Sequence, residues 1–520
     1  MTIQKSGDEL FKLIVSHSKE YGFIFPSSEI YDGLNASYDY GPFGAQLKFN
    51  IRDYWWRAMT QLQDDIVGID AAIFMHPKVW KASGHVDAFN DPMIDNRDSK
   101  KRYRADNLIE DFLQSIQNKI AKEVEKGKKK FGETFNEEQF LATNPNVLRS
   151  AEKFNTINTR YLQALAANDL NELRNIIIDC EIADPESGSR NWTDVRQFNL
   201  MFSMQFGALA ADAENSQVYL RPETAQGIFV NFLNVQKTTR KKLPFGIAQV
   251  GKAFRNEIVA RQFIFRMREF EQMEMQFFVK PGTEMEWYNY WKQTRMRWHQ
   301  ALHPENKLRF HDHDKLAHYA NAAVDIEFEF PFGFKELEGI HSRTDFDLSE
   351  HQKLSGRKLQ YFDHELNENY VPYVVETSVG LDRMFLATLS NAIAEEEVPD
   401  AEGGVATRTV LKLPPALAPV KLAVLPLLNQ KGLPEKGEEI FKKLRLHFDC
   451  QFEAKDTIGR RYRRQDAIGT PWCVTVDFET LENDTVTLRN RDSLEQIRIP
   501  IAEIQARVNE TVSVTKLLEK

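Results

Sequence analysis

The sequence predicts an α+β protein with more than one domain, and three observations support this. The chain has 520 residues, more than a single hydrophobic core normally holds. The stretch Phe245–Phe278 has two apolar, β-prone flanks joined by a charged loop, which indicates an antiparallel strand pair. From about residue 413 onward, apolar strand patterns alternate with helix patterns, which indicates a small separate α/β domain.

Changes in composition divide the chain into five parts. Residues 1–95 mix helix and loop patterns, and residues 96–195 are charged and helix-prone, which predicts an inserted helical subdomain. Residues 196–395 are rich in strand patterns and aromatic side chains, so they are expected to continue the fold begun by the first part. Residues 396–412 contain an acidic, glycine-containing run typical of a linker, and residues 413–520 are the α/β domain.

Composition and charge favour a globular protein of the cytoplasm. Hydrophobic residues make up 42% and charged residues 28%, and the net charge of -9 argues against a protein that coats nucleic acid indiscriminately. No apolar run approaches the ~18 residues of a membrane helix, and the first residues do not resemble a secretory signal. The cysteines Cys180, Cys450 and Cys473 have neither disulfide nor metal spacing, which fits a reducing compartment.

The strand pair Phe245–Phe278 carries an unusual number of charges for an apolar segment. Unpaired buried charge is costly, so the pattern favours a highly charged ligand, with arginines on phosphates or carboxylates and glutamates on amino groups. An internal ladder of salt bridges on a solvated sheet face is the alternative. The charged residues of this pattern are Arg255, Glu257, Arg266, Arg268, Glu269, Glu271 and Glu274.

Several segments resemble a known enzyme family. AFRNE at Ala253–Glu257 and VETSVGLDRMF at Val375–Phe385 resemble the second and third motifs of class II aminoacyl-tRNA synthetases. Other segments, in the family's order and spread over nearly the whole chain, resemble the dimeric glycyl-tRNA synthetases: Ser27–Lys48, His76–Met93, Arg102–Glu110, Phe198–Phe202, Arg221–Phe232 and Lys335–Leu348. The resemblance implies a class II catalytic domain built on an antiparallel sheet, a helical insertion and a C-terminal anticodon-binding domain. The lack of a GxGxxG or GKS/T loop agrees with a fold other than a Rossmann fold.

The resemblance also implies an activity and partners. The expected enzyme is a cytoplasmic, homodimeric glycine–tRNA ligase that forms glycyl-adenylate and pyrophosphate from glycine and Mg-ATP. It then transfers glycine to the 3′-terminal adenosine of glycine tRNA, with neither DNA nor a membrane as a partner. The turn Gly41–Gly44 and the helix predicted over Gln46–Met59 correspond to the family's dimer-interface motif, although the residues alone equally fit a surface loop before a helix.

ATP activation of an amino acid requires that two anions be neutralised and held in line. By resemblance, Arg255 bridges the α-phosphate and the glycine carboxylate, and Glu257 accepts a hydrogen bond from the adenine amino group. Phe270 and Arg383 cover the two adenine faces, and Glu336 ligates Mg²⁺, which prefers oxygen. Arg255, Glu257 and Arg383 form the expected catalytic set, although the charged residues also fit purely structural pairing. Further ATP-binding candidates are Asn256, Phe265, Arg266, Arg268, Leu337, Gly380 and Asp382.

The resemblance places three carboxylates, Glu223, Glu274 and Glu376, around the glycine ammonium. Ser378 is expected against the glycine Cα, where it excludes larger side chains. No natural α-amino acid is smaller than glycine, so no editing domain is required. For Glu223 the alternative is a charge at the start of a helix. Further glycine-binding candidates are Arg104, Phe270 and Gly380.

The segment RRYRR is the strongest local sign of RNA binding, because arginines reach phosphates and tyrosine stacks on unpaired bases. A solvated helix face is the alternative for any single arginine in it. The candidates are Arg460, Arg461, Tyr462, Arg463 and Arg464. A weaker candidate for contact with the acceptor stem is the lysine-rich run Lys126–Lys130.

Zinc is not expected. Some bacterial relatives carry cysteine pairs near the segment DNRDSKKRYRAD, which here has none. The run HDHD at 311–314 suggests a metal site at first sight, but neighbouring side chains do not face one way, so at most two of the four can converge. We therefore expect a solvated loop there.

Two other functions fit parts of the sequence. A non-catalytic nucleic-acid-binding homologue would have no need of Arg255, Glu257, Glu336 and Arg383 together. A ligase for alanine or serine is disfavoured by the three carboxylates with Ser378.

Overall fold

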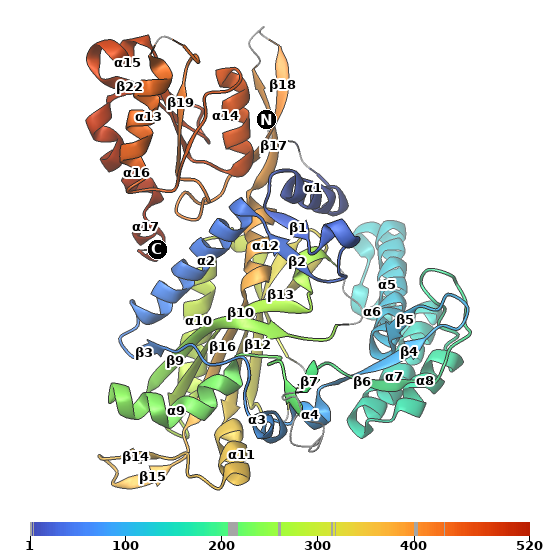
Figure 1. The fold of residues 1–520 in the computed structure, drawn as a ribbon. Coiled ribbons are helices and arrows are strands. Elements are labelled where there is room, and N and C mark those ends of the chain that lie inside the picture. The colour runs from blue at the N-terminus through green and yellow to red at the C-terminus, as the bar shows by residue number, and fades with distance from the viewer. Residues whose placement is uncertain are drawn as a thin grey trace. The chain divides into compact units, whose positions relative to one another are not determined.

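The computed structural model describes residues 3, 5–205, 217–257, 262–313, 316, 317, 319–399, 404–430 and 432–519 (Figure 1). The chain divides into two compact units. The first comprises Met1–Ser83, Ser203–Arg255 and Arg261–Lys520, and the second comprises Gly84–Phe202 and Asn256–Ala260. The predicted insertion, 96–195, lies inside the second unit. No helix among the described residues has both the length and the apolar content that a membrane span requires.

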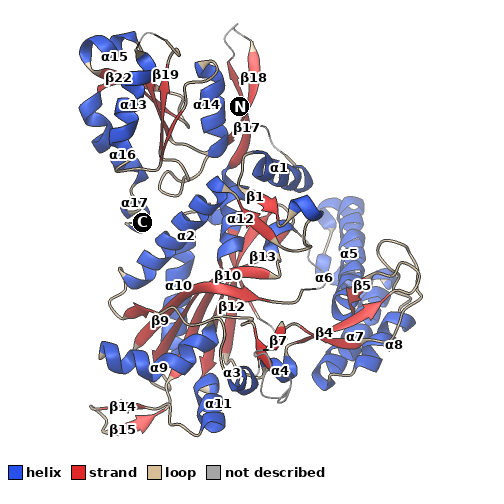
Figure 2. Cartoon of the chain, viewed as in Figure 1, coloured by secondary structure: helices blue, strands red, loops and turns tan. Residues whose placement is uncertain are grey.

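A seven-stranded sheet with the order β11-β12-β13-β16-β10-β9-β3 dominates the first unit (Figure 2). All neighbours pair antiparallel except β3 and β9, which are parallel. The predicted antiparallel pair within Phe245–Phe278 is confirmed as β9 and β10. The strands are β3 (Ile66–Gly68), β9 (Phe245–Phe254), β10 (Glu269–Val279), β11 (Leu308–Asp312), β12 (Ala322–Phe330), β13 (Gly333–Thr344) and β16 (Tyr373–Gly380).

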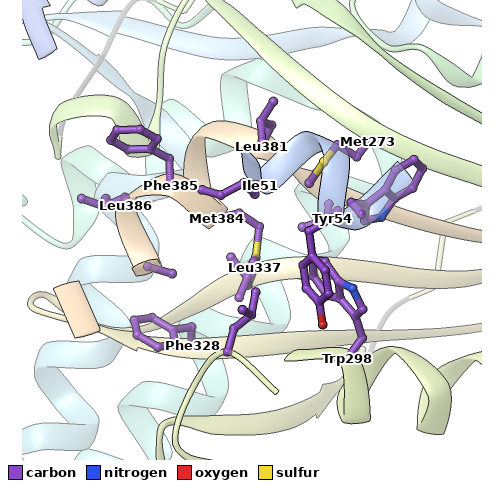
Figure 3. Close-up of a cluster of buried hydrophobic side chains, with 14 of the residues drawn as sticks. Ile51, Tyr54, Met273, Trp298, Phe328, Leu337, Leu381, Met384, Phe385 and Leu386 are labelled. Carbon is purple, nitrogen blue, oxygen red and sulfur yellow. The ribbon is translucent and has the colours of Figure 1, made fainter. Parts of the chain in front are cut away.

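The two faces of this sheet differ because side chains alternate along each strand. On β10, Met273, Met275 and Phe277 join the main hydrophobic core, whereas Glu274 and Gln276 point to the other face. The core face is covered by α2 (Pro42–Thr60), α10 (Glu284–Gln300) and α12 (Leu381–Ala392). Figure 3 shows side chains of this core, with Ile51 and Tyr54 from α2, Trp298 from α10 and Met384 and Phe385 from α12.

A buried ion pair stabilises the contact between β13 and α10. Glu338 on β13 is fully buried and accepts hydrogen bonds from Arg295 Nε at 2.6 Å and Nη2 at 3.1 Å. His299 Nε2 lies 2.6 Å from the same carboxylate. Burial alone would raise the pKa of Glu338, but Arg295 and His299 lower it to about 2, so the carboxylate stays charged within the core.

The opposite face packs against α9 (Ala225–Thr239). Phe229 and Phe232 of α9 are fully buried against Phe245 of β9 and Phe278 of β10, and α11 (Phe346–Ser355) contributes Leu348 to the same cluster. Because α9 lies on this face, the residues just before it reach the polar side chains of β10.

The second unit combines a small sheet with long helices. Strand β4 (Asn90–Asp95) pairs antiparallel with β5 (Arg102–Arg104) and β6 (Arg196–Asn199). Its core is formed mainly by apolar residues of α5 (Ala105–Phe131), α7 (Pro145–Ala167) and α8 (Leu170–Asp179). Asn144 and Asp169 cap α7 and α8 through their side-chain oxygens. The remaining elements of this unit are α4 (His85–Ala88), η2 (Gly132–Thr134) and α6 (Glu137–Thr143).

The C-terminal part contains a five-stranded mixed sheet with the order β20-β19-β21-β22-β23. Its central strands are apolar and buried, and helices α13 and α16 pack against them. The elements are β19 (Leu422–Pro426), α13 (Leu433–Leu444), β20 (Cys450–Phe452), α14 (Ile458–Ile468), β21 (Trp472–Val476), α15 (Phe478–Asn483), β22 (Thr485–Asn490), β23 (Gln496–Pro500), η6 (Ile501–Glu503), α16 (Ile504–Val512) and α17 (Thr515–Leu518).

The segment 396–412, predicted as a linker, is mostly a β-hairpin. Strands β17 (Ile393–Pro399) and β18 (Val405–Leu411) pair antiparallel along their length; residues 400–403 lie outside the described residues. Buried Arg408 on β18 donates to Glu396 at 2.7 Å and to Asp466 of α14 at 2.8 Å. Glu396, one of the acidic residues that suggested a solvated linker, therefore pairs with Arg408, and Arg408 ties the hairpin to α14.

Shorter elements of the first unit connect these parts. They are α1 (Gly7–Glu20), β1 (Ile24–Pro26), η1 (Glu29–Tyr31), β2 (Tyr38–Tyr40), α3 (Pro77–Ala82), β7 (Ser203–Gln205), β8 (Gln217–Tyr219), η4 (Phe263–Phe265), η5 (Glu305–Lys307), β14 (Tyr361–Asp363) and β15 (Glu368–Tyr370).

Candidate active site

The strand register brings polar side chains from adjacent strands together on the α9 face of the sheet. Glu274 on β10 is directly opposite Ser378 on β16, and Glu376 on β16 is directly opposite His341 on β13. Directly opposite residues on neighbouring strands have Cβ atoms about 4.5–5.5 Å apart. Glu274, Glu376 and Glu223, which precedes α9, together form a carboxylate cluster.

Glu274 is 2% exposed, and three side-chain donors surround its carboxylate. Ser378 Oγ donates at 2.7 Å, Thr224 Oγ1 at 2.5 Å and Gln272 Nε2 at 3.0 Å. Burial, followed by the charges of Glu376 and Glu223, raises the pKa of Glu274 to about 8, although the hydroxyl donors oppose the shift. Ionisation of Glu274 beside Glu376 and Glu223 is therefore unfavourable unless a bound cation offsets the repulsion.

Glu376 has a different environment because an arginine and a histidine face it. Arg343 Nη1 donates to it at 3.1 Å, His341 Nδ1 lies 3.1 Å from its other oxygen, and Gln276 Nε2 donates at 2.8 Å. Burial pushes the pKa of Glu376 upward, but Arg343 and His341 outweigh burial and lower it to about 2. Glu376 thus stays ionised, whereas ionisation of Glu274 is disfavoured.

Glu223 completes the carboxylate cluster. Gln226 Nε2 donates to it at 2.9 Å and also to Asp347 at 3.0 Å. The charge of Glu223 raises the pKa of both other carboxylates, so the three predicted residues interact. Asp347 in turn accepts two hydrogen bonds from Arg343. Sequence reasoning missed Thr224, Gln226, His341, Arg343 and Asp347, because only strand register and the position of α9 bring them here.

Arg255 follows β9, and its guanidinium lies over the ring of Phe270 on β10, 5.2 Å from the ring centroid. Its Nε donates to the carbonyl of Pro222 at 3.1 Å, and its backbone N–H donates to the carbonyl of Arg268 at 2.9 Å. Arg266 and Arg268 are half-buried on the return toward β10, and residues 258–261 lie outside the described residues. The two strand ends thus place Arg255 and Phe270 in contact.

Arg383 on α12 contacts two other predicted ATP-binding residues. Its Nη1 lies 3.0 Å from the Glu336 carboxylate, and its guanidinium covers the ring of Phe265 at 4.3 Å from the centroid. The Arg383 charge, with a smaller contribution from Arg255, lowers the pKa of Glu336. Glu336 is exposed at the start of β13, so it offers an ionised oxygen donor of the kind that Mg²⁺ prefers.

Comparison with known proteins identifies the family of the chain. Family models match the glycyl-tRNA synthetase insertion domain 1 over residues 91–200, the tRNA synthetase class II core domain (G, H, P, S and T) over 205–392 and the anticodon binding domain over 421–511. A glycine–tRNA ligase of Chlorobaculum tepidum is 52% identical over 94% of this chain and 97% of its own length. One of Staphylococcus haemolyticus is 50% identical over 96% of this chain and 98% of its own length. The chain belongs to the glycine–tRNA ligase family.

The predictions of family, fold, enzyme class and function are therefore confirmed: the chain is an aminoacyl-tRNA ligase of the glycine-specific kind. A solved structure titled as the RNA binding domain of threonyl-tRNA synthetase from Cryptosporidium parvum Iowa II aligns over 96% of this chain and 98% of that chain. Its TM-score is 0.58 and its sequence identity is 14%, so it is evidence of the shared fold alone.

Two residues predicted to bind ATP have other roles in this member of the glycine–tRNA ligase family. Asp382 is 3% exposed and accepts hydrogen bonds from Tyr40 Oη, from Lys48 Nζ at 2.9 Å and from the backbone N–H of Glu271 at 2.7 Å. The Leu337 side chain is 1% exposed and lies in the core drawn in Figure 3, which leaves only its backbone to contact a nucleotide. Both side chains thus contribute to the fold, and contact of these two residues with ATP stays a prediction.

Three further candidates, Arg104, Asn256 and Glu257, belong to the second unit. Arg104 is paired with Asp106 at 2.6 Å and with Asp91 at 3.0 Å. The charge of Glu257 also acts on Arg104, so these two predicted residues are neighbours within that unit. Gly380, in contrast, is the N-cap of α12 and lies at the end of β16, next to Arg383.

The arginines of the RRYRR segment differ sharply in exposure. Arg461 is fully buried on α14 and donates to the carbonyls of Pro426 at 2.6 Å and Glu453 at 2.8 Å. Tyr462 is half-buried, with Arg489 over its ring at 4.6 Å, and Arg464 pairs with Asp456 at 2.9 Å. Only Arg460 and Arg463 of this segment are exposed. The prediction that Arg461 contacts RNA is wrong in this conformation, because its guanidinium is buried and donates to backbone carbonyls.

The run at 311–314 is only in part the solvated loop that we expected, because its first two residues are exposed but belong to a strand. His311 and Asp312 end strand β11, and Asp314 lies outside the described residues. His313 pairs with Asp325 on β12, its Nε2 lying 2.9 Å from the carboxylate.

Proposed function

We propose that the carboxylate cluster binds the glycine ammonium during formation of glycyl-adenylate and its transfer to glycine tRNA. The observation that carries this proposal is the raised pKa of Glu274 beside Glu376 and Glu223. Like charges held together in a buried site destabilise one another, and a bound cation relieves the repulsion. The basic side chains Arg343 and His341 pair with Glu376, whereas the described hydrogen bonds to Glu274 come from hydroxyl and amide groups.

Selection of glycine follows from the groups around Glu274. Ser378 donates to Glu274 from the neighbouring strand. We propose that its hydroxyl occupies the place where a substrate side chain would begin. Both residues lie within the central sheet, which resists displacement more than a loop does. A larger amino acid must therefore displace Ser378 or lose the contact with Glu274.

Arg255 is proposed to hold the α-phosphate and the substrate carboxylate, and Phe270 to support the adenine ring. Arg383 covers the other adenine face and reaches the γ-phosphate after leaving Glu336. Glu336 then offers its oxygens to the Mg²⁺ that accompanies ATP, which neutralises the phosphates during transfer. Asn256, Glu257, Arg266, Arg268, Gly380 and Arg104 remain candidates for further contacts with ATP or glycine.

The tRNA is proposed to contact the C-terminal domain through the exposed Arg460 and Arg463 of α14. Arginine side chains on a helix surface match the phosphates and splayed bases of an anticodon loop. Assembly as a homodimer and a cytoplasmic location are also proposed, and sedimentation of the purified chain tests the former.

Glycine-dependent exchange of pyrophosphate into ATP, without tRNA, tests the proposal. The wild-type chain is expected to catalyse exchange with glycine but not with alanine or serine. Glu274→Gln should lose exchange at ordinary glycine concentrations, whereas Glu368→Gln, a matched change on the exposed strand β15, should not. Exchange with another amino acid would overturn the role assigned to Ser378. Exchange with none would favour a non-catalytic RNA-binding homologue.

A further inference from the structure

Three potential metal ligands from adjacent strands meet beside the carboxylate cluster. His313 follows β11, Asp325 lies on β12 and His341 lies on β13. One ligand atom of each lies within 4.8 Å of the other two, and all three side chains are half-buried. Two imidazoles and one carboxylate at this separation form a set that transition metals bind, with positions left open for water.

His341 has the outer partner that metal-binding histidines usually have. Its Nδ1 lies 3.1 Å from Glu376, which leaves Nε2 to face a metal. A histidine that donates its second ring N–H to a carboxylate is held in one tautomer and one orientation. Glu376 is itself held by Arg343 and Gln276, so this outer carboxylate is fixed in place.

Gly339 provides the space in which His341 and Asp325 approach each other. It is directly opposite Asp325 on β12 and opposite Ser378 on β16. A Cβ atom at this position would lie 2.8 Å from His341 Cε1 and 3.6 Å from Asp325 Oδ1. Any larger residue here would push the imidazole away, so the glycine maintains the arrangement of the three ligands.

The surrounding charges also favour a cation. Glu336 and Glu376 lie close enough for their charges to act on Asp325 and His341, respectively. Among the described residues, the basic side chain in contact with the Asp325 carboxylate is His313, and a metal ion bound between them would replace that contact.

We propose that His313, Asp325 and His341 bind one transition-metal ion, best suited to Zn²⁺, at a site separate from the Mg²⁺ that accompanies ATP. Imidazole ligands favour zinc and its neighbours, whereas Mg²⁺ prefers an all-oxygen shell, so the two sites differ in chemistry. The ion holds His341 as an N–H donor to Glu376 and thereby positions that carboxylate within the cluster. The proposal goes beyond the ligase activity and does not depend on the roles assigned to Glu274 or Arg255.

Metal binding to the full-length chain, dialysed against a chelator, tests this directly. Zn²⁺ is titrated by calorimetry, and Co²⁺ serves as a coloured substitute. The expected result is about one ion per chain, with a Co²⁺ absorption spectrum of four- or five-coordinate character. A large excess of Mg²⁺ should not displace it. Displacement by Mg²⁺, or a six-coordinate Co²⁺ spectrum, would instead indicate an oxygen site and overturn the proposal.

Variants separate loss of a ligand from loss of the fold. Asp325→Asn and His341→Gln should each weaken Zn²⁺ binding by more than about 100-fold, and Glu376→Gln by about 10- to 100-fold through its effect on His341. Gly339→Ala should also weaken binding, although it removes no ligand. His364→Gln, on an exposed turn beside β14, is the control and should bind normally. Unchanged binding in Asp325→Asn and His341→Gln, with thermal unfolding as in the wild type, would refute the site.

Discussion

The strongest prediction concerns the pH dependence of glycine binding. Burial and two neighbouring carboxylates raise the pKa of Glu274 to about 8 in the free protein. Below that pH most Glu274 side chains are protonated, so the ionised form that binds an ammonium group is the minority and grows as pH rises. The KM for glycine should therefore fall as pH increases toward 8.

The size of the effect follows from the pKa. With a pKa of about 8, roughly one Glu274 in a hundred is ionised at pH 6, about one in ten at pH 7 and about half at pH 8. If only the ionised form binds, the KM for glycine falls by about tenfold between pH 6 and pH 7 and by about fivefold between pH 7 and pH 8. Glycine binding at pH 7 should also release close to one proton, since the ammonium lowers the pKa of Glu274.

Steady-state pyrophosphate exchange between pH 6 and pH 8 measures the KM of glycine and of ATP separately. The KM of ATP serves as an internal control, because Glu274 is not assigned to the nucleotide. Glu274→Gln should bind glycine weakly at every pH and lose the slope. A glycine KM that is flat in the wild type, or a slope that persists in Glu274→Gln, would refute the assignment.

Four further predictions concern other residues. Glu376→Ala should raise the KM of glycine about 100-fold and change the KM of ATP little, because about 3 kcal/mol of charge-assisted binding is lost; equal changes in both constants would contradict its role. Arg461→Ala should lower the free energy of unfolding of the C-terminal domain by about 3 kcal/mol, since buried carbonyls lose their donor. Arg460→Ala should instead weaken tRNA binding in filter assays without changing thermal unfolding; the opposite pattern would reverse the two assignments. Glu338→Ala should reduce the free energy of unfolding by about 3–5 kcal/mol, because Arg295 is left buried without its carboxylate, and an unchanged melting temperature would count against that.

Sequence periodicity was sufficient to predict the strand pair β9 and β10 and the alternating elements of the C-terminal domain. It failed where burial depends on tertiary packing. Arg461 and Arg460 are adjacent and chemically identical, yet only the position of α14 against β19 and β20 decides that one is buried. The buried contacts of Asp382 were missed for the same reason, since its three partners come from β2, α2 and β10.

The candidate site, too, was predicted only where local sequence segments marked its residues. Local motifs pointed to Glu223, Glu274 and Glu376, because each stands in a recognisable segment. His341 and Arg343 also stand in such a segment, Lys335–Leu348, but nothing in it marks them as neighbours of Glu376, because that depends on the register of β13 against β16. Likewise, the histidine run at 311–314 suggested a metal site within one short segment, whereas the convergent ligands are His313 of that run, Asp325 on β12 and His341 on β13.

Asp382 also has a consequence for folding during synthesis. Its contacts with Tyr40 and Lys48 span 342 and 334 residues of sequence. At about 5–20 residues per second, a ribosome needs roughly 20 to 70 s to make the intervening chain. Throughout that interval the apolar side of α2, with Tyr54 and Trp55, has no α12 to pack against. The second unit builds its core from residues between Ile94 and Val195, so it can close long before the first unit. Nascent chains are therefore expected to carry a folded insertion beside an exposed amphipathic helix, a natural substrate for a ribosome-associated chaperone.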